Sequence, residues 1–125
     1  MQLDEVDDAA LEVIEKGYCE IVVVSVGPLG AMLVTKESFE MVSAPAVKKT
    51  STVGAGDSMV AGMVWMLEQG KSLSEMVRFG IACGTAATMN SGTRLFKPED
   101  FYRLYDWINN KRLIKSVVVQ RKYSL

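Results

Sequence analysis

Residues 52–58 read TVGAGDS, a stretch in which two glycines, Gly54 and Gly56, lead directly to Asp57. A hydroxyl-rich, β-branched segment precedes this stretch, and a long apolar segment follows it. Glycines allow the backbone to turn sharply at such a junction. The pattern therefore predicts a strand-like approach, a tight turn and then a helix from about Asp57 to Glu68.

The beginning of this helix has the chemistry of an anion site. The first amides of a helix have no intrahelical acceptor, and the helix dipole adds positive potential there. Asp57 would lie at this positive end of the helix. Such an aspartate, beside amides that hold a phosphoryl group, can accept a proton from an attacking hydroxyl. A helix-capping turn with Asp57 as a stabilising first-turn acid explains the same residues, and both interpretations remain open at this level.

Two other nucleotide-binding motifs are excluded. Residues 70–72, GKS, end like a Walker A loop, but the position where that loop requires its first glycine is Trp65. Residues 54–56, GAG, begin like a dinucleotide-binding fingerprint, but the third glycine position holds Met59. Neither a P-loop nor a dinucleotide-binding fold is supported.

The rest of the chain predicts an α/β fold with a mixed sheet and flanking helices. The helix that follows Asp57 is apolar on all sides, with Val60, Met63, Val64 and Leu67 on one face, so we expect it to be well buried. A capping box, Ser72 to Glu75, begins the next helix, in which residues 83–87 are small enough for a backbone or a flat ligand to approach. The other expected elements are a helix at 4–16, strands at 21–26, 31–35 and 39–43, a turn at 27–30, a helix after Pro98 and a strand at 117–120.

Composition narrows the classes of function. The chain has 125 residues, a net charge of −1 and no histidine. The absence of histidine excludes histidine-dependent catalytic triads and HExxH zinc sites. Cys19 and Cys83 form no CxxC pair, which is typical of reduced core cysteines. We find no signal peptide and no apolar run long enough to cross a membrane, and we expect residues 111–125, with five basic and no acidic side chains, to form a solvated tail.

Residues 51–62, STVGAGDSMVAG, resemble the C-terminal signature of the phosphofructokinase B (ribokinase-like) family of carbohydrate kinases. Residues 25–31, SVGPLGA, resemble the nucleotide-binding turn of that family. Residues 76–82 and 86–94 resemble the segments that line its adenine pocket and its monovalent-cation loop. The resemblance covers roughly residues 5–108, and STVGAGDSMV is most similar to the minor type of bacterial 6-phosphofructokinase.

The resemblance implies a role for each matching residue. Asp57 would be the catalytic base for the sugar hydroxyl. Gly54, Ala55 and Gly56 would form the anion hole for the transferred phosphoryl group. The residues implied in ATP binding are Ser25, Gly27, Gly30 and Thr52 near the phosphates and ribose, and Ile81 and Thr85 at the adenine. The residues implied around a potassium-like ion are Ser51, Val53, Ala87, Asn90, Gly92 and Arg94. An ordinary loop beside a helix end is the alternative for this last group.

The resemblance also implies an activity, a partial ribokinase-like three-layer sandwich and a division of the chain. Residues 1–110 would be the C-terminal nucleotide-binding part of a cytoplasmic kinase that transfers phosphate from ATP, with Mg²⁺, to the 1-hydroxyl of fructose 6-phosphate. The sugar-binding residues, the lid and the Asn-x-x-Glu motif of the family have no counterpart here, so we expect the chain alone to be inactive. Another sugar, sugar phosphate or nucleoside as substrate, a noncatalytic nucleotide-binding remnant and a homo-oligomer remain open; nucleic acid and membrane are not expected partners.

Overall fold

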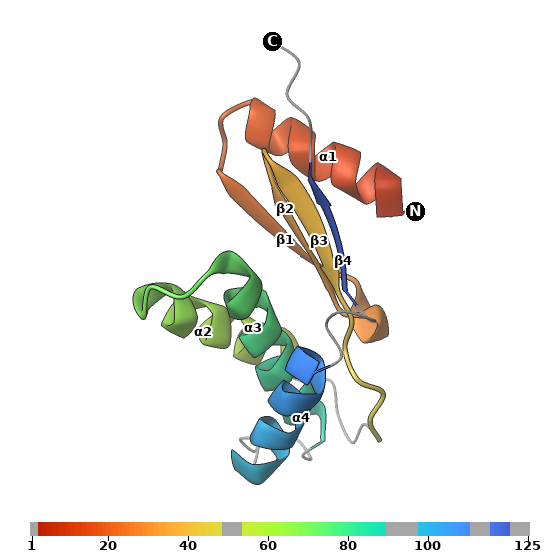
Figure 1. Ribbon diagram of the computed structural model, residues 1–125, viewed down its shortest axis with the longest axis vertical. Helices are drawn as coiled ribbons and strands as arrows, with labels where there is room; N and C mark the ends of the chain where they lie inside the picture. The colour runs from red at the N-terminus through yellow and green to blue at the C-terminus, as the bar shows by residue number, and fades with distance from the viewer. Residues whose placement is uncertain (1–2, 49–53, 90–97, 111–115, 121–125) are drawn as a thin grey trace.

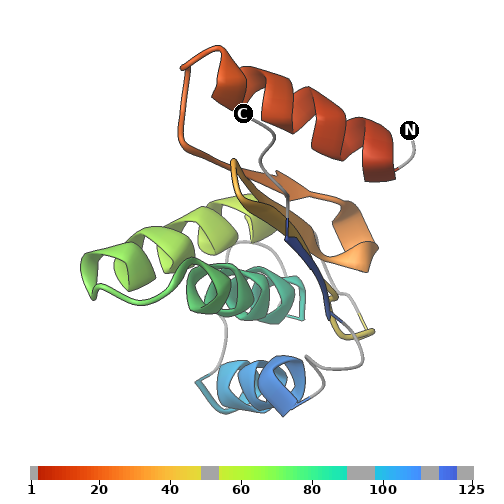
Figure 2. The same cartoon turned by 45° about the horizontal axis from the view of Figure 1, so that its top comes forward.

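The computed structural model describes residues 3–48, 54–89, 98–110 and 116–120 and forms three layers. One helix covers one face of a four-stranded sheet, and three helices lie on the other side (Figures 1 and 2). The helices are α1 (Leu3–Glu15), α2 (Ala55–Glu68), α3 (Leu73–Thr88) and α4 (Pro98–Asn110); the strands are β1 (Ile21–Ser25), β2 (Ala31–Thr35), β3 (Ser38–Val42) and β4 (Ser116–Gln120); and η1 (Gly27–Leu29) is a short 3-10 turn.

The sheet has the order β1-β2-β3-β4, and each neighbouring pair is antiparallel. The α/β class and the layered arrangement are confirmed. The parallel pairing that a mixed sheet requires does not occur among these four strands, because each follows its neighbour in the sheet order and reverses direction. β4 confirms the strand expected at 117–120 and pairs with β3, so the expectation that all of residues 111–125 form a solvated tail is wrong for this part.

Alternation along β2 builds both cores of the protein. Ala31 and Leu33 belong to the core between the sheet and the helices α2, α3 and α4, whereas Met32 and Val34 pack against Ala10 and other residues of α1. Side chains of a strand point alternately to its two faces, and all four of these are buried. β2 is therefore the strand that fixes α1 on one face and the helical layer on the other.

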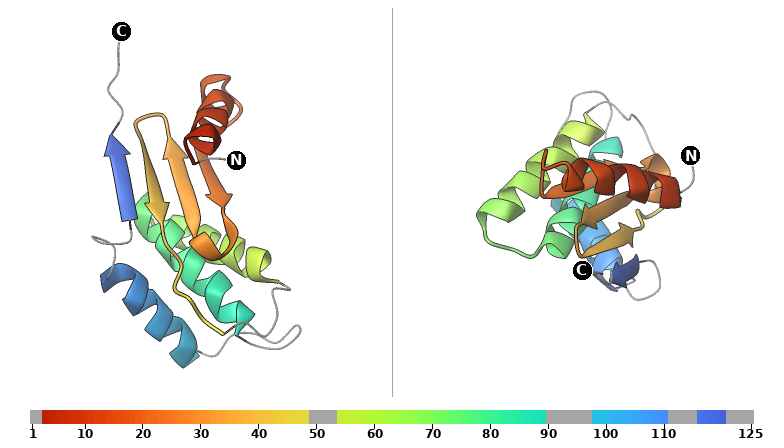
Figure 3. Two further views of the ribbon diagram at one scale, coloured as in Figure 1. Left: turned by 90° about the vertical axis from the view of Figure 1, so that its right-hand side faces the viewer. Right: turned by 90° about the horizontal axis from the view of Figure 1, so that it is seen from above.

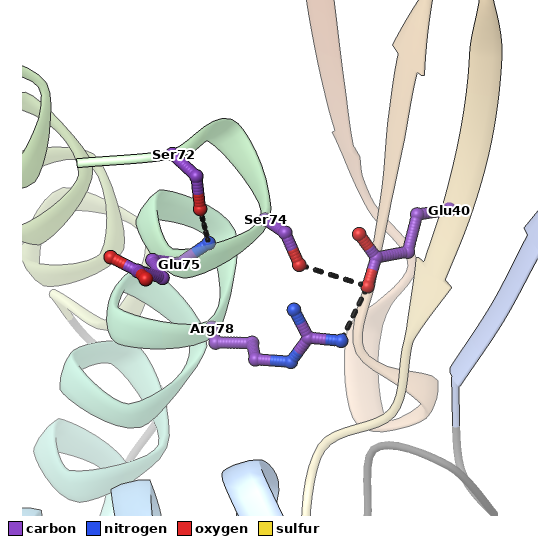
Figure 4. A network of polar contacts seen from close by, with 5 residues as sticks. All are labelled: Glu40, Ser72, Ser74, Glu75 and Arg78. Carbon is purple, nitrogen blue, oxygen red and sulfur yellow. Dashed lines mark hydrogen bonds and ion pairs between the residues drawn. The ribbon is translucent and has the colours of Figure 1, made fainter.

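α3 is the central helix of its layer. It begins as the sequence predicted, because the Ser72 side chain accepts a hydrogen bond of 3.2 Å from the amide of Glu75. Arg78 and Ser74 of this helix both contact the carboxylate of Glu40 on β3 (Figure 4). These contacts attach α3 to the sheet at a point where both Glu40 and Arg78 are buried.

α2 packs against α3, and its burial differs from the expectation. Met59, Gly62 and Met66 face α3 and are buried, but Val60, Val64 and Leu67 are about half exposed. The expectation that this helix is buried all round is therefore wrong for one side. Its apolar composition cannot distinguish a face covered by this chain from a face that this chain leaves open.

No helix in the described ranges is both long enough and apolar enough to cross a lipid bilayer.

Candidate nucleotide-binding site

The turn after β1 forms the first wall of the candidate site. The amide of Val26 donates a hydrogen bond of 2.9 Å to the carbonyl of Gly30, and the amide of Gly30 donates one of 3.2 Å to the carbonyl of Gly27. Both glycines have positive φ angles, 62° at Gly27 and 118° at Gly30. Side-chain-bearing residues rarely adopt these angles, so the two glycines explain why the chain can reverse within five residues.

Gly30 is needed for a second reason, because the chain after β3 crosses directly beside it. A Cβ atom at Gly30 would overlap the carbonyl oxygen of Val42 and approach the amide of Ala44. The amide of Ala44 also donates a 3.4 Å hydrogen bond to the carbonyl of Leu29. The close approach places residues 44–47 alongside the turn, where they form the second wall.

The start of α2 forms the third wall. Gly54 precedes the helix with a φ of 81°, and its carbonyl accepts a hydrogen bond of 2.9 Å from the amide of Ser58. The helix begins at Ala55, two residues before the expected start. No side chain caps it. The amides of Ala55, Gly56 and Asp57 belong to the first turn and have no intrahelical acceptor, so they are available to an anion.

α3 closes the site with small side chains. A Cβ atom at Gly84 would lie 3.0 Å from the carbonyl oxygen of Ala55, so a glycine allows the start of α2 to approach α3. The Thr88 hydroxyl donates a 2.6 Å hydrogen bond to the carbonyl of Thr85, which satisfies a buried polar group beside the site. The close approach of a backbone that was expected at residues 83–87 therefore occurs where Gly84 meets Ala55.

These walls enclose a cavity of about 450 Å³. Seven of the residues assigned to nucleotide binding or to the anion hole line it together: Ser25, Gly27, Gly30, Ala55, Gly56, Ile81 and Thr85. Asp57 is exposed in the first turn of α2, next to the lining residue Gly56, and Gly54 precedes that turn. Four segments far apart in the sequence thus converge on one space.

Sequence reasoning missed about half of the lining. The missed residues are Pro28, Ala44, Pro45, Ala46, Val47, Met59, Gly84 and Thr88. Gly84 and Thr88 fall in or beside the small-residue run of α3, which was a usable signal. Residues 44–47 had none, because they read only as a loop after a strand, and a fold is needed to bring them to the turn at 27–30.

The cavity suits a flat, largely apolar group with an anion at one end. No charged side chain occurs among the residues that line it. Glycine, alanine, proline and aliphatic side chains form most of its surface, and the first turn of α2 supplies donors. Cavities of this size and lining are typical of small-molecule and cofactor sites.

The family of this chain follows from comparison with known proteins. The model of the pfkB family carbohydrate kinases matches residues 2–100. The chain belongs to the pfkB family. It is 49% identical over 108 residues to the ATP-dependent 6-phosphofructokinase isozyme 2 of Escherichia coli, covering 86% of this chain and 35% of that protein. It is 38% identical over 95 residues to the 1-phosphofructokinase of Haloferax volcanii, covering 74% of this chain and 30% of that one.

Solved structures agree with this membership in the pfkB family. The crystal structure of phosphofructokinase-2 from Escherichia coli in complex with potassium has a TM-score of 0.82 and 49% identity, over 87% of this chain and 35% of that one. This chain therefore spans about a third of the length of the pfkB relatives that it matches. The family resemblance and the partial ribokinase-like fold expected from the sequence are confirmed.

Most of the residues expected around a monovalent cation lie outside the described part of the chain. Within these ranges no cluster of three or more Asp, Glu, Cys or His side chains is placed to hold a metal ion. Of the residues expected around a monovalent cation, only Ala87 is described, buried in the last turn of α3. Ser51, Val53, Asn90, Gly92 and Arg94, and the ATP-binding candidate Thr52, lie outside the described residues.

Proposed function

We propose that this chain is the nucleotide-binding part of an ATP-dependent sugar-phosphate kinase, with 6-phosphofructokinase as the leading activity. The observation that carries the proposal is the cavity in which Ser25, Gly30, Ile81 and Thr85 meet the first turn of α2. The relative of higher identity, from Escherichia coli, carries the name of that activity. The reaction would transfer phosphate from ATP to the 1-hydroxyl of fructose 6-phosphate.

In this proposal, different lining residues bind different parts of the nucleotide. The apolar floor made by Ile81 and the small residues of α3 receives the adenine. The turn at Gly27 and Gly30 lets the backbone approach the ribose and phosphates closely. The amides of Ala55 and Gly56 then hold the transferred phosphoryl group, because the positive end of α2 stabilises charge that develops on its oxygens.

Asp57 has the role of general base. It accepts the proton of the attacking sugar hydroxyl while the neighbouring amides hold the phosphoryl group. ATP supplies the phosphoryl group, and Mg²⁺ neutralises the charge of the phosphates when it is bound. Thr52 would contact the nucleotide, and Ser51, Val53, Ala87, Asn90, Gly92 and Arg94 would surround K⁺, mainly through backbone oxygens, which hard cations prefer. We further propose that residues 1–110 act as one nucleotide-binding unit in the cytoplasm.

A second candidate is phosphorylation of another sugar phosphate by the same machinery. The Haloferax volcanii relative is named 1-phosphofructokinase, and it shares 38% identity with this chain. The described cavity accounts for the nucleotide and includes no charged side chain that would select one sugar phosphate from another. A homo-oligomer is also compatible with the family, since a tetrameric inhibited form is described for Escherichia coli phosphofructokinase-2.

Isothermal titration calorimetry with ATP and Mg²⁺, with and without K⁺, tests the proposal on this chain. We expect saturable binding that K⁺ strengthens and that GTP reproduces more weakly. A chain that is folded by circular dichroism but releases no heat with ATP under either condition would contradict the assignment of the cavity to a nucleotide. Binding that is indifferent to K⁺ would remove the cation assignment alone.

A further inference from the structure

The helical layer contains a second cavity, separate from the candidate nucleotide site. α2 and α4 both pack against α3 and lie on either side of it (Figure 3). The second cavity measures about 280 Å³, and among the described residues its lining comes from all three helices: Trp65, Phe79, Cys83, Pro98, Phe101 and Tyr102. None of these residues lines the cavity assigned to the nucleotide. The proposed function therefore leaves the second cavity without a role.

The two cavities lie on opposite sides of α3. Ile81 and Thr85 line the nucleotide cavity, whereas Phe79 and Cys83 line the second one. Successive residues of a helix are rotated by about 100°, so residues two positions apart point in nearly opposite directions. Phe79 and Ile81 have this separation, and so do Cys83 and Thr85. A ligand in the second cavity therefore does not occupy the space of the nucleotide.

Aromatic rings form most of the lining of the second cavity. The ring of Phe79 stacks on that of Trp65, with 5.3 Å between the ring centroids, and meets that of Phe101 edge-on at 4.9 Å. The rings of Phe101 and Tyr102 also meet edge-on, at 5.2 Å. Phe101 is buried and Phe79 is partly buried. Trp65 and Tyr102 are 51% and 65% exposed, so two of the four rings leave much of their apolar surface in water.

The chemistry of this lining favours a neutral, flat ligand. No lining residue carries a charged side chain, and burial raises the pKa of the Cys83 thiol to about 11, so it is a small uncharged group at neutral pH. Aromatic rings attract a further ring through offset-stacked and edge-to-face contacts. Pockets for drug-sized ligands usually measure about 300–1,000 Å³, so this cavity suits a single ring system.

We propose that the second cavity is a binding site for a small, neutral aromatic molecule of one ring or two fused rings. The ligand inserts among the four aromatic side chains and covers the exposed apolar surface of Trp65 and Tyr102. Removal of this surface from water drives binding, and contacts between rings select an aromatic ligand. The site does not depend on the proposed kinase activity.

Fluorine NMR of this chain with 5-fluoroindole as the probe tests the site. We expect one saturable binding event whose affinity does not change when ATP and Mg²⁺ are added in excess. Trp65→Leu keeps an apolar side chain but removes the ring, so it should weaken binding by about three- to tenfold. Trp65→Phe keeps a ring and should stay within about twofold. The matched control is Tyr18→Ala, which removes a ring that is 78% exposed and outside the cavity, and it should change the affinity by less than about twofold.

Several results would overturn the proposal. Displacement of 5-fluoroindole by ATP would place the probe in the nucleotide cavity. Equal losses of affinity in Trp65→Phe and Trp65→Leu, with both variants folded by circular dichroism, would show that the ring is not recognised. Equally strong competition by cyclohexanol would indicate an apolar surface without preference for aromatic ligands, and stronger competition by tetramethylammonium would indicate a cation site.

Self-association would also overturn it. If sedimentation velocity finds a dimer of this chain that Trp65→Leu abolishes and 5-fluoroindole does not bind, the occupant of the cavity is a second copy. None of these measurements depends on phosphoryl transfer. Binding of 5-fluoroindole by a folded chain that does not bind ATP would support the second site and contradict the proposed function, and the converse result would do the opposite.

Discussion

Arg78 of α3 and Glu40 of β3 form a buried ion pair, with 2.5 Å between the guanidinium nitrogen and the carboxylate oxygen. Their side chains are only 5% and 7% exposed. The pair joins the two halves of the candidate site, because α3 carries Ile81 and Thr85 whereas the sheet leads into the turn at residues 27–30. The ion pair therefore connects the two sides of the cavity without lining it.

Removal of one partner of this pair should be strongly destabilising. Arg78→Met leaves the carboxylate of Glu40 buried without its cation, so we expect a loss of about 3–5 kcal/mol in the free energy of unfolding. Ser74→Ala removes only a 3.1 Å hydrogen bond to the same carboxylate and should cost about 1.5–3 kcal/mol. Urea unfolding of this chain measures both. A double variant, Glu40→Leu with Arg78→Met, should recover much of the loss. If Arg78→Met alone were harmless, the pair would not have the role assigned to it.

The turn at residues 27–30 gives a second test, with a matched control inside it. Gly27→Ala meets no atom within 4 Å and should cost only the left-handed backbone strain, about 1–2 kcal/mol. Gly30→Ala adds an overlap with the Val42 carbonyl, and overpacking of this kind costs roughly 1–3 kcal/mol more. The measurement is urea unfolding, with ATP calorimetry on the folded fraction. Equal losses from the two variants would show that the chain after β3 can move away from Gly30.

Local signals account for the part of the fold that sequence could predict. The capping box at Ser72 fixed the start of α3 because both groups lie within one turn of each other. The glycines at 54 and 56 indicated the turn before α2 for a similar reason. The pairing of Glu40 with Arg78 gave no sequence signal, since 38 residues separate them and each alone resembles an ordinary surface charge.

The residues that line the site show the same difference between local and long-range signals. Residues next to a glycine motif or a small-residue run were identified, whereas residues 44–47 reach the cavity only because β3 ends beside Gly30. The exposure of one face of α2 was not predicted, because apolar side chains indicate that a face is buried but not which part of a protein covers it. The start of α2 at Ala55 was two residues earlier than expected because glycine can act as the residue before a helix without a side-chain cap.

The two cysteines should differ in reactivity. Burial raises the pKa of the Cys83 thiol to about 11, whereas Cys19 is partly exposed. At pH 8, a maleimide should therefore label Cys19 in the folded chain and leave Cys83 unlabelled until urea is added, because the thiolate is the reactive form. Rapid labelling of both cysteines in the folded chain would contradict the packing of Cys83 between α2 and α3, where its sulfur approaches Gly62.

The same thiol should make the stability of the fold sensitive to alkali. In the unfolded chain Cys83 ionises near its ordinary value of 9, but in the folded chain it stays protonated up to about 11. Ionisation of this thiol thus favours the unfolded state. Its contribution to the free energy of unfolding is therefore fully present below about pH 9 and is lost as the pH rises towards 11. The comparison of wild type with Cys83→Ala isolates this effect from other groups that titrate in the same range. If the free energies of unfolding of the two proteins changed in parallel between pH 8 and 11, the ionisation of Cys83 would not contribute to this pH dependence.

Asp57 provides the sharpest test of the catalytic assignment. It lies in the first turn of α2 beside Gly56, which lines the cavity, and it is exposed. In a single-chain chimera in which this chain replaces the segment that it matches in the Escherichia coli relative, Asp57→Asn should lower kcat by roughly 10²–10⁴-fold, the range that a general base contributes. The affinity for ATP should stay nearly constant, because the amides proposed to hold the phosphates remain. Glu68→Gln, at the other end of the same helix, is the matched control and should leave kcat unchanged. A fall of only a few-fold for Asp57→Asn in an otherwise active chimera would mean that Asp57 stabilises the helix start and that another group accepts the proton.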